Sequence, residues 1–220
     1  MTEPRTELLP DRFRAVVFDM DGLLLDTELL WHRAETELFA KHGGEFSWDD
    51  KMVVIGSSFD FTADYFADRL GYPRERGAAL VTEMVELMHA QLREQVAGRP
   101  GAVELVERLR GRTRLGLASN SPRDLVDTAL ATARITDAFD AVVTSDDVER
   151  SKPAPDIYLA ACERLGVPPA DALALEDSAS GIAAAKAAGL TCIAVPQFAE
   201  TDVSAADRVI DSLEDLLAET

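Results

Sequence analysis

The chain has 220 residues, of which 47% are hydrophobic and 28% charged, a composition typical of a globular protein with one large domain or with a domain and a smaller insert. Its 22 basic and 40 acidic residues give a formal net charge of −18. This acidity argues against nucleic acid and anionic membrane surfaces as partners, because both attract basic proteins. A small anionic partner is still compatible with it, since a bound divalent cation can reverse the local field.

Two features of the sequence predict a cytoplasmic location. Cys162 and Cys192 are the only cysteines, and two thiols without metal-type spacing fit a reducing compartment better than a disulfide framework. The segment Met1–Arg14 lacks the apolar stretch of a signal peptide, and no part of the chain approaches a membrane span of about 18 apolar residues. We expect a monomer or a weak dimer.

The first predicted strand, Ala15–Phe18, is an apolar run that leads directly into Asp19-Met20-Asp21-Gly22. A buried strand that ends in a sharp polar turn delivers its next side chains to the C-terminal edge of a sheet. In open α/β sheets this edge is where ligands bind. Two carboxylates placed there hold a cation, share a proton or carry out covalent chemistry.

The segment after the first strand is strongly helical. Apolar stripes at helical spacing predict helices over residues 28–41, 61–70 and 80–92. We predict an inserted helical domain over residues 27–97, with Gly98-Arg99-Pro100-Gly101 as the returning hinge and Pro100 opening the next helix. The core domain is then formed by residues 12–26 and 98–220.

Further short apolar runs alternate with helical patterns in the rest of the chain. These runs predict strands over 115–118, 141–143, 172–175, 192–195 and 208–210, and a final helix over 212–217. Strands that alternate with helices indicate right-handed βαβ units, and therefore an α/β fold with a mostly parallel sheet.

Four polar clusters follow the ends of the predicted strands. They are Asp19/Asp21, Ser119-Asn120-Ser121, Lys152-Pro153 and Glu176-Asp177-Ser178. Taken singly, each also has a structural interpretation, as a helix cap or a solvated loop residue. Because parallel strands all end at one edge of the sheet, the four clusters should converge there. Together their carboxylates, ammonium and small polar donors suit phosphoryl transfer with Mg²⁺, the hard cation that oxygen ligands favour.

In this order after strands, the clusters resemble the four motifs of the haloacid dehalogenase (HAD) superfamily, in the subgroup whose helical cap follows the first motif. The resemblance covers about residues 14–212. It implies a Rossmann-like parallel sheet core with an inserted α-helical cap domain. Within the family, the chain is most similar to β-phosphoglucomutases and small sugar-phosphate phosphatases.

The resemblance implies a metal site and a nucleophile. Asp19 would be the nucleophile and a Mg²⁺ ligand, and Asp21 the general acid/base, with its backbone carbonyl on the metal. Asp177 would complete the metal site, with Glu176 as a direct or water-mediated partner. Gly22 would leave room for the backbone to turn.

The resemblance also implies the residues that bind the phosphoryl group. Ser119 and Asn120 would bind the group in transfer, and Lys152 would pair with it and with the nucleophile. Gly181 would let the following helix approach the site, and Thr27 would begin the hinge into the cap.

The predicted cap contains three candidate substrate contacts. The segment Gly56-Ser57-Ser58-Phe59 resembles the cap loop that reaches the substrate in this family, and a plain helix-to-helix connection is an equal alternative. We assign Gly56 and Ser57 to substrate binding on this resemblance. Trp31 either faces the substrate or belongs to the cap core, and His32 either points toward the substrate or packs within the cap.

Two positions separate a mutase from a hydrolase. An ungapped comparison places Phe59 and Trp31 where β-phosphoglucomutases carry an arginine and a histidine. We therefore predict a Mg²⁺-dependent phosphatase that hydrolyses a small phosphorylated metabolite, such as a hexose or pentose phosphate, through an aspartyl-phosphate. The alternatives are a phosphosugar mutase and a binding or regulatory protein that carries out no chemistry.

Overall fold

The computed structural model describes residues 12–217. Residues 1–11, which make up most of the segment expected to lack a signal peptide, and residues 218–220, the end of the predicted core domain, lie outside this range. None of the helices between residues 12 and 217 has both the length and the apolar character that a membrane span requires.

The core is a six-stranded sheet in the order β3-β2-β1-β4-β5-β6, in which every pair of neighbours is parallel. The strands are β1 (Ala15–Phe18), β2 (Arg114–Ala118), β3 (Ala141–Val143), β4 (Ala172–Glu176), β5 (Thr191–Ala194) and β6 (Arg208–Val209). All their ends lie within one residue of the prediction. In register, Val16 of β1 lies between Leu115 of β2 and Leu173 of β4. The predicted parallel α/β fold is therefore confirmed.

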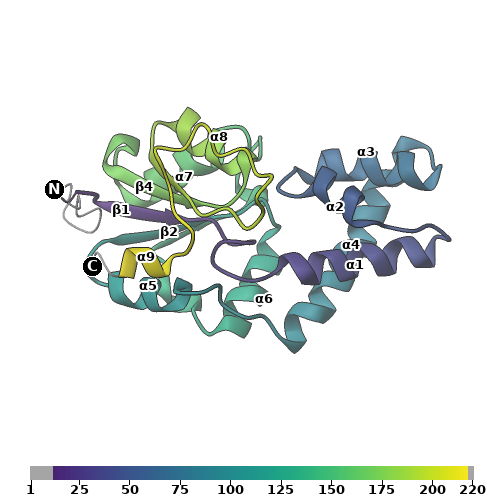
Figure 1. Ribbon diagram of the computed structural model, residues 1–220, viewed down its shortest axis with the longest axis horizontal. Helices are drawn as coiled ribbons and strands as arrows, with labels where there is room; N and C mark the ends of the chain where they lie inside the picture. The colour runs from purple at the N-terminus through teal and green to yellow at the C-terminus, as the bar shows by residue number, and fades with distance from the viewer. Residues whose placement is uncertain (1–11, 218–220) are drawn as a thin grey trace.

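Alternating side chains of the strands build two separate cores on the two faces of the sheet. Large residues such as Phe18 and Leu175 pack on one face, and small ones such as Ala15 and Ala174 pack on the other. The first face is covered by α5 (Ala102–Leu109), α6 (Arg123–Ala133) and α9 (Glu214–Leu217), and the second by α7 (Asp156–Leu165) and α8 (Ala179–Ala188) (Figure 1). Because strand side chains alternate between faces, this sequence pattern determines which helices each face can accommodate.

A second, helical layer lies beside the core and is inserted between β1 and β2 (Figure 1). It contains α1 (Glu28–Lys41), α2 (Trp48–Val54), α3 (Phe59–Leu70) and α4 (Gly77–Glu94). The two chain crossings into this layer are paired, because the Asp26 N–H donates to the Ala97 carbonyl at 2.9 Å. The predicted domain boundaries, 26/27 and 97/98, fall at this pairing.

Short helical turns complete the fold. They are η1 (Arg74–Arg76), η2 (Thr136–Ala138), η3 (Ser145–Asp147) and η4 (Pro169–Asp171).

Several helices differ from the predictions. Helix α3 begins at Phe59 and α4 at Gly77, each ahead of its predicted start at residue 61 or 80. The seven-residue α2 was missed, although Ser47 and Asp50 form a reciprocal capping box at its start. Helix α5 begins at Ala102 and not at Pro100, because Gly101 precedes it with a φ of +75°. Such a backbone conformation is outside the helical region and is one that glycine adopts readily. Helix α9 begins at Glu214, after Ser212 accepts a hydrogen bond from the Glu214 N–H.

Candidate active site

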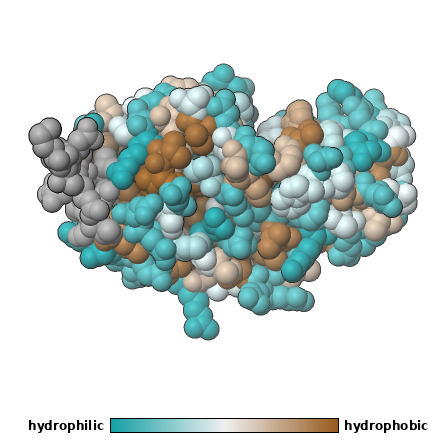
Figure 2. All heavy atoms as spheres, viewed as in Figure 1, coloured by the Kyte–Doolittle hydropathy of each residue, from teal (hydrophilic) through white to brown (hydrophobic). Residues whose placement is uncertain are grey.

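The parallel sheet brings the four motifs to one edge, where a pocket of about 90 Å³ lies between the core and the cap. Asp19 and Asp21 follow β1, Asn120 follows β2, and Asp177 follows β4, so the shared strand direction explains their convergence. Lys152 reaches the same pocket from the loop before α7. The space-filling view shows an indentation between the core and cap lobes on a mostly hydrophilic face (Figure 2).

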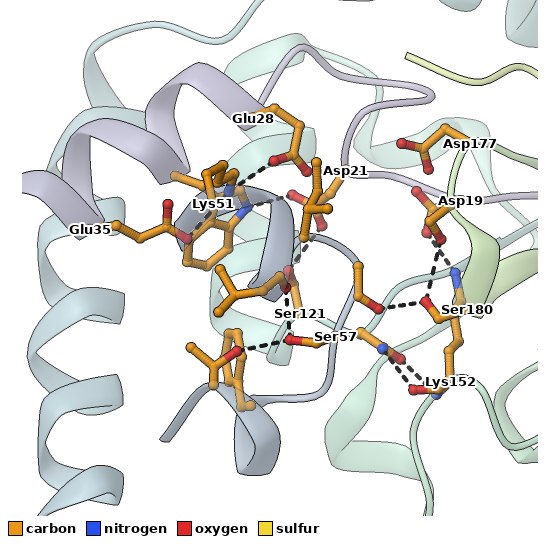
Figure 3. Close-up of a pocket in the computed structure, with 18 of the residues that line it drawn as sticks. Asp19, Asp21, Glu28, Glu35, Lys51, Ser57, Ser121, Lys152, Asp177 and Ser180 are labelled. Carbon is orange, nitrogen blue, oxygen red and sulfur yellow. Dashed lines mark hydrogen bonds and ion pairs between the residues drawn. The ribbon is translucent and has the colours of Figure 1, made fainter. Parts of the chain in front are cut away.

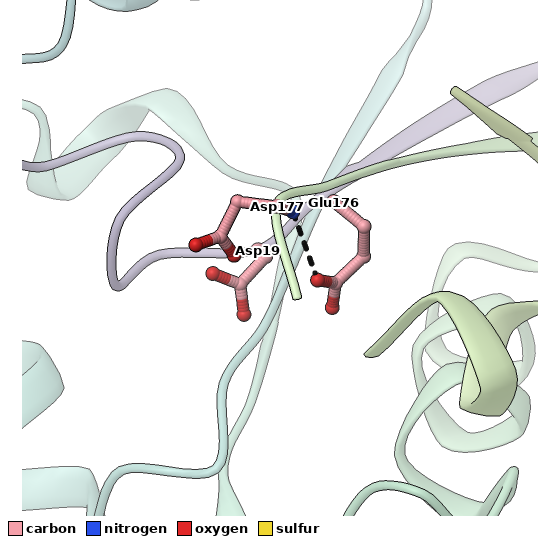
Figure 4. A group of neighbouring side chains, drawn as sticks. All are labelled: Asp19, Glu176 and Asp177. Carbon is pink, nitrogen blue, oxygen red and sulfur yellow. Dashed lines mark hydrogen bonds between the residues drawn. The ribbon is translucent and has the colours of Figure 1, made fainter. Parts of the chain in front are cut away.

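Three buried carboxylates gather on the core side of this pocket (Figure 4). Asp19, Glu176 and Asp177 each place an oxygen within 4.8 Å of the others, and none is more than 6% exposed. Burial raises the pKa of Asp19 and of Asp177 well above the ordinary value, and repulsion between the carboxylates raises both pKa values further.

The donor set fits a hard divalent cation. Asp177 Oδ1 is buried and has no hydrogen-bond partner among the residues that the structure describes. Several carboxylate oxygens with one unsatisfied buried oxygen are suited to Mg²⁺, which would offset their mutual repulsion. Gly22 lies directly beside these oxygens, and a side chain would not fit there, because a Cβ on Gly22 would lie 2.4 Å from Asp177 Oδ2. Gly22 also has a φ of +86°, so a glycine suits the turn itself.

Lys152 neutralises part of this charge. Its Nζ lies 2.6 Å from Asp19 Oδ1, 2.6 Å from Glu176 Oε1 and 2.9 Å from the Ala118 carbonyl. Burial by itself lowers the pKa of Lys152, but the two carboxylates raise it by more, so the net pKa lies above the ordinary value. Lys152 is therefore an ammonium fixed beside the predicted nucleophile, as the resemblance implies.

Asn120 holds the backbone of Lys152. Its Oδ1 accepts from the Lys152 N–H at 2.9 Å, and its Nδ2 donates to the Lys152 carbonyl at 3.3 Å. Asn120 also lines the pocket, so these bonds give it a positioning role beside its predicted role in phosphoryl binding.

Ser119 and Ser121 lie differently from one another. Ser119 is fully buried and is not part of the pocket lining, whereas Ser121 lines the pocket. Both hydroxyls donate to Asp21 Oδ2, at 3.1 and 2.9 Å. The binding of a phosphoryl group by Ser119 remains a prediction, and Ser121 is a pocket residue to which the sequence assigned no role.

Asp21 connects the core to the cap. Its Oδ1 accepts from Thr27 Oγ1 at 2.8 Å and from Trp31 Nε1 at 3.0 Å, and both donors belong to the start of the cap. Its Oδ2 accepts from the two serine hydroxyls that follow β2. Trp31 therefore borders the site, and it also packs in the buried hydrophobic core, so both predicted placements of its side chain hold in part.

Both carboxylate oxygens of Glu176 accept hydrogen bonds. Its Oε1 accepts from Lys152 and, at 2.8 Å, from the Tyr158 hydroxyl, and its Oε2 accepts from the N–H groups of Asp177 and Ser178. Helix α8 approaches closely here, because a Cβ on Gly181 would lie 1.8 Å from Glu176 Oε1. These bonds orient Lys152 and the turn after β4, and a direct or water-mediated metal role for Glu176 stays a prediction.

Tyr158 was missed by sequence reasoning. It lies on the apolar face of α7, fully buried. A buried tyrosine hydroxyl requires a partner, and that requirement is the only signal that could have pointed to it.

The cap loop reaches the site. Gly56, Ser57 and Phe59 line the pocket, and Ser180 Oγ at the start of α8 donates to the Gly56 carbonyl at 2.5 Å. His32 is not part of the lining and packs within the cap, with its ring centroid 5.0 Å from that of Trp48.

Three charged cap residues in the pocket were not predicted. Glu28, Lys51 and Glu35 lie on the side of the pocket opposite Asp19 and Asp177 (Figure 3), and all three side chains are buried. Burial raises the pKa of Glu35 from its ordinary value of 4.5 to about 7, although Lys51 acts in the opposite direction. Only the position of Glu35 on the apolar face of α1 hints at this burial in the sequence.

Comparison with known proteins identifies the family. The haloacid dehalogenase-like hydrolase family model matches residues 13–189. The chain is 34% identical to hexitol phosphatase B of Escherichia coli (strain K12) over 189 residues, which are 85% of each protein. It is 31% identical to fructose-1-phosphate phosphatase YqaB of the same strain over 185 residues, 84% of this chain and 97% of the relative.

A solved structure agrees with these relatives. The crystal structure of CbbY from Rhodobacter sphaeroides in complex with phosphate superimposes with a TM-score of 0.84 and 32% identity, covering 94% of this chain and 98% of that one. The chain therefore belongs to the haloacid dehalogenase-like hydrolases. The predicted resemblance, with its α/β core and helical insert, is confirmed.

Proposed function

We propose that the protein is a Mg²⁺-dependent phosphatase that hydrolyses a small sugar or polyol phosphate through an aspartyl-phosphate on Asp19. One observation carries the proposal: the Asp19 carboxylate borders the pocket, with an ammonium 2.6 Å away and the unsatisfied Asp177 Oδ1 in the same carboxylate cluster. The names of the two phosphatase relatives support a sugar or hexitol phosphate as the substrate class.

In the first half-reaction, a carboxylate oxygen of Asp19 attacks phosphorus, and the bond from phosphorus to the substrate alcohol breaks. Asp21 donates a proton to the leaving oxygen. Mg²⁺ held by Asp19 and Asp177, when bound, supplies positive charge to the phosphoryl oxygens. The Lys152 ammonium adds a second fixed charge and needs no reorganisation as the reaction proceeds.

In the second half-reaction, water attacks the acyl phosphate, and Asp21 takes up a proton from it. Phosphate leaves and the Asp19 carboxylate is restored. Asp21 alternates between two protonation states in this cycle, and its surroundings accommodate both. Three of its four partners, Thr27, Ser119 and Ser121, are hydroxyls, which can rotate from donating to accepting when Asp21 gains a proton. The fourth, the Trp31 indole N–H, can only donate.

Two buried thiols support a reducing cytoplasm as the place of action. Cys162 and Cys192 are free, and burial raises their pKa values to about 11 and about 12. Thiols of this kind are unreactive, and they fit a compartment where disulfides are rare.

The test is phosphate release from a panel of hexitol, hexose and pentose phosphates, nucleotides and phosphoglycolate, with and without Mg²⁺. Asp19→Asn removes the nucleophile and keeps the side-chain size, and Asp60→Asn on the exposed start of α3 is the matched control. We expect Mg²⁺-dependent release from sugar or polyol phosphates, abolished only in Asp19→Asn. Isomerisation of β-glucose 1-phosphate with a bisphosphate primer, without release, would favour the mutase. Tight binding without turnover would favour the binding protein.

A further inference from the structure

The cap side of the pocket carries a charged cluster that the chemistry at Asp19 does not use. Lys51 Nζ of α2 lies 2.9 Å from Glu28 Oε2 and 3.2 Å from Glu35 Oε1, both on α1. The three side chains are between 3% and 7% exposed. They line the same pocket as the core motifs and face them across it (Figure 3).

The cluster is not satisfied by its own contacts. Glu35 Oε2 is buried and has no hydrogen-bond partner among the described residues. Glu28 Oε2 is also buried, but it is paired with the Lys51 ammonium 2.9 Å away. Buried acceptors are normally hydrogen-bonded, because an unsatisfied one costs its full desolvation penalty. Glu35 lines the substrate pocket, so its unpartnered oxygen matches a ligand that brings a hydroxyl donor.

The sign of the cluster excludes one class of ligand. Two carboxylates and one ammonium give a net charge of −1, or zero when Glu35 is protonated. Among the described residues that line the pocket, Lys51 and Lys152 are the only cations. Lys152 is committed to the core carboxylates, so no free cation faces the distal end of the substrate.

We propose that Glu28, Lys51 and Glu35 form the subsite that binds the distal hydroxyl groups of a polyol or sugar monophosphate and rejects a second phosphate. The carboxylates accept from substrate hydroxyls, and Lys51 donates to one while it holds the two carboxylates apart. This inference rests on the proposed phosphatase activity and adds the residues that select the leaving alcohol. It also disfavours a phosphosugar mutase, whose bisphosphate would place its second phosphate against this cluster.

The test compares three substrates in one enzyme preparation with Mg²⁺: sorbitol 6-phosphate, fructose 1,6-bisphosphate and 4-nitrophenyl phosphate, which has no distal hydroxyl. The variants are Glu35→Gln and Glu28→Gln. Glu37→Gln is the matched control, since it lies on the same helix and its side chain is 53% exposed. The readout is the ratio of kcat/KM values between substrates, which does not depend on the fraction of folded enzyme.

For wild type and Glu37→Gln we expect a kcat/KM on sorbitol 6-phosphate at least 10-fold above that on the bisphosphate, because hydrogen bonds to charged groups are worth about 10-fold to 100-fold in binding. In Glu35→Gln and Glu28→Gln, the ratio of sorbitol 6-phosphate to 4-nitrophenyl phosphate should fall about 10-fold. Unchanged ratios in both variants, or a preference of the wild type for the bisphosphate, would overturn the subsite. Failure of the wild type to hydrolyse any of the three substrates would instead overturn the proposed phosphatase.

Discussion

Replacing Asp177 by asparagine should stabilise the protein without divalent cations and remove its response to Mg²⁺. A carboxylate oxygen of Asp177 lies within 4.8 Å of a carboxylate oxygen of Asp19 and of one of Glu176. At an effective dielectric constant of 20, two unit charges at that separation repel by about 3.5 kcal/mol. Asp177 has two such neighbours, and Lys152 offsets about one of them. We therefore expect the free energy of unfolding to rise by about 2–3 kcal/mol near pH 8, since proton uptake relieves part of the repulsion.

The measurement is urea unfolding followed by circular dichroism, in EDTA and in saturating Mg²⁺. Mg²⁺ at about 100 times its Kd should stabilise the wild type by about 2.7 kcal/mol and leave Asp177→Asn almost unchanged. The difference in the free energy of unfolding between the two proteins should therefore shrink or change sign. Asp171→Asn, which removes an exposed carboxylate 3.5 Å from Arg14, is the control and should change stability by about 0.5 kcal/mol or less. The reasoning is refuted if Asp177→Asn is no more stable than the wild type in EDTA, or if Mg²⁺ stabilises both proteins equally.

Three further substitutions test other contacts. Lys152→Met leaves buried carboxylates uncompensated and should lower the free energy of unfolding, measured in urea, by about 3–5 kcal/mol. The control, Lys41→Met, breaks an exposed ion pair and should lower it by about 0.5 kcal/mol. A loss for Lys152→Met as small as that of the control would contradict the expectation. Glu35 has a pKa of about 7 in the folded protein against an ordinary 4.5, so its protonation contributes stability that is fully present below pH 4.5 and is lost as pH rises through 7. The Tm of the wild type should thus fall more steeply than that of Glu35→Gln between about pH 4.5 and pH 7, and equal slopes would argue against the raised pKa. Gly181→Ala would force a Cβ to within 1.8 Å of Glu176 Oε1. We therefore expect the free energy of unfolding to fall by several kcal/mol and the Mg²⁺-dependent phosphatase activity to be lost. Wild-type values of both would show that α8 can move away from Glu176.

The sheet could be predicted because its signals are local. Runs such as Ala15–Phe18 and Ala141–Val143 are uniformly apolar, as strands covered on both faces require, and each is followed by a turn. The short α2 could not be found in the same way. With seven residues it has too few turns to show a helical period, and its Lys51 and Asp50 read as surface residues although both are buried.

The convergence of the four motifs also followed from the sequence. Once the strands are parallel, Asp19, Asn120 and Asp177 must meet at one edge, whatever the exact packing of the helices. Details of contact could not be predicted in this way. The placement of Ser119 behind Asp21, and the bond from Tyr158 to Glu176, depend on side-chain directions that the strand pattern does not specify.

The sequence by itself therefore determined the fold class, the helical insert and the sheet edge at which the four motifs meet, because apolar periodicity and strand direction can be read from consecutive residues. Only the tertiary structure decided what the cap contributes to the pocket. Glu28, Glu35 and Lys51 are charged, and charged residues are expected at the surface. Their burial against one another arises because Lys51 of α2 reaches two carboxylates of α1, and the partner of a helix face is not encoded in the periodicity of either helix.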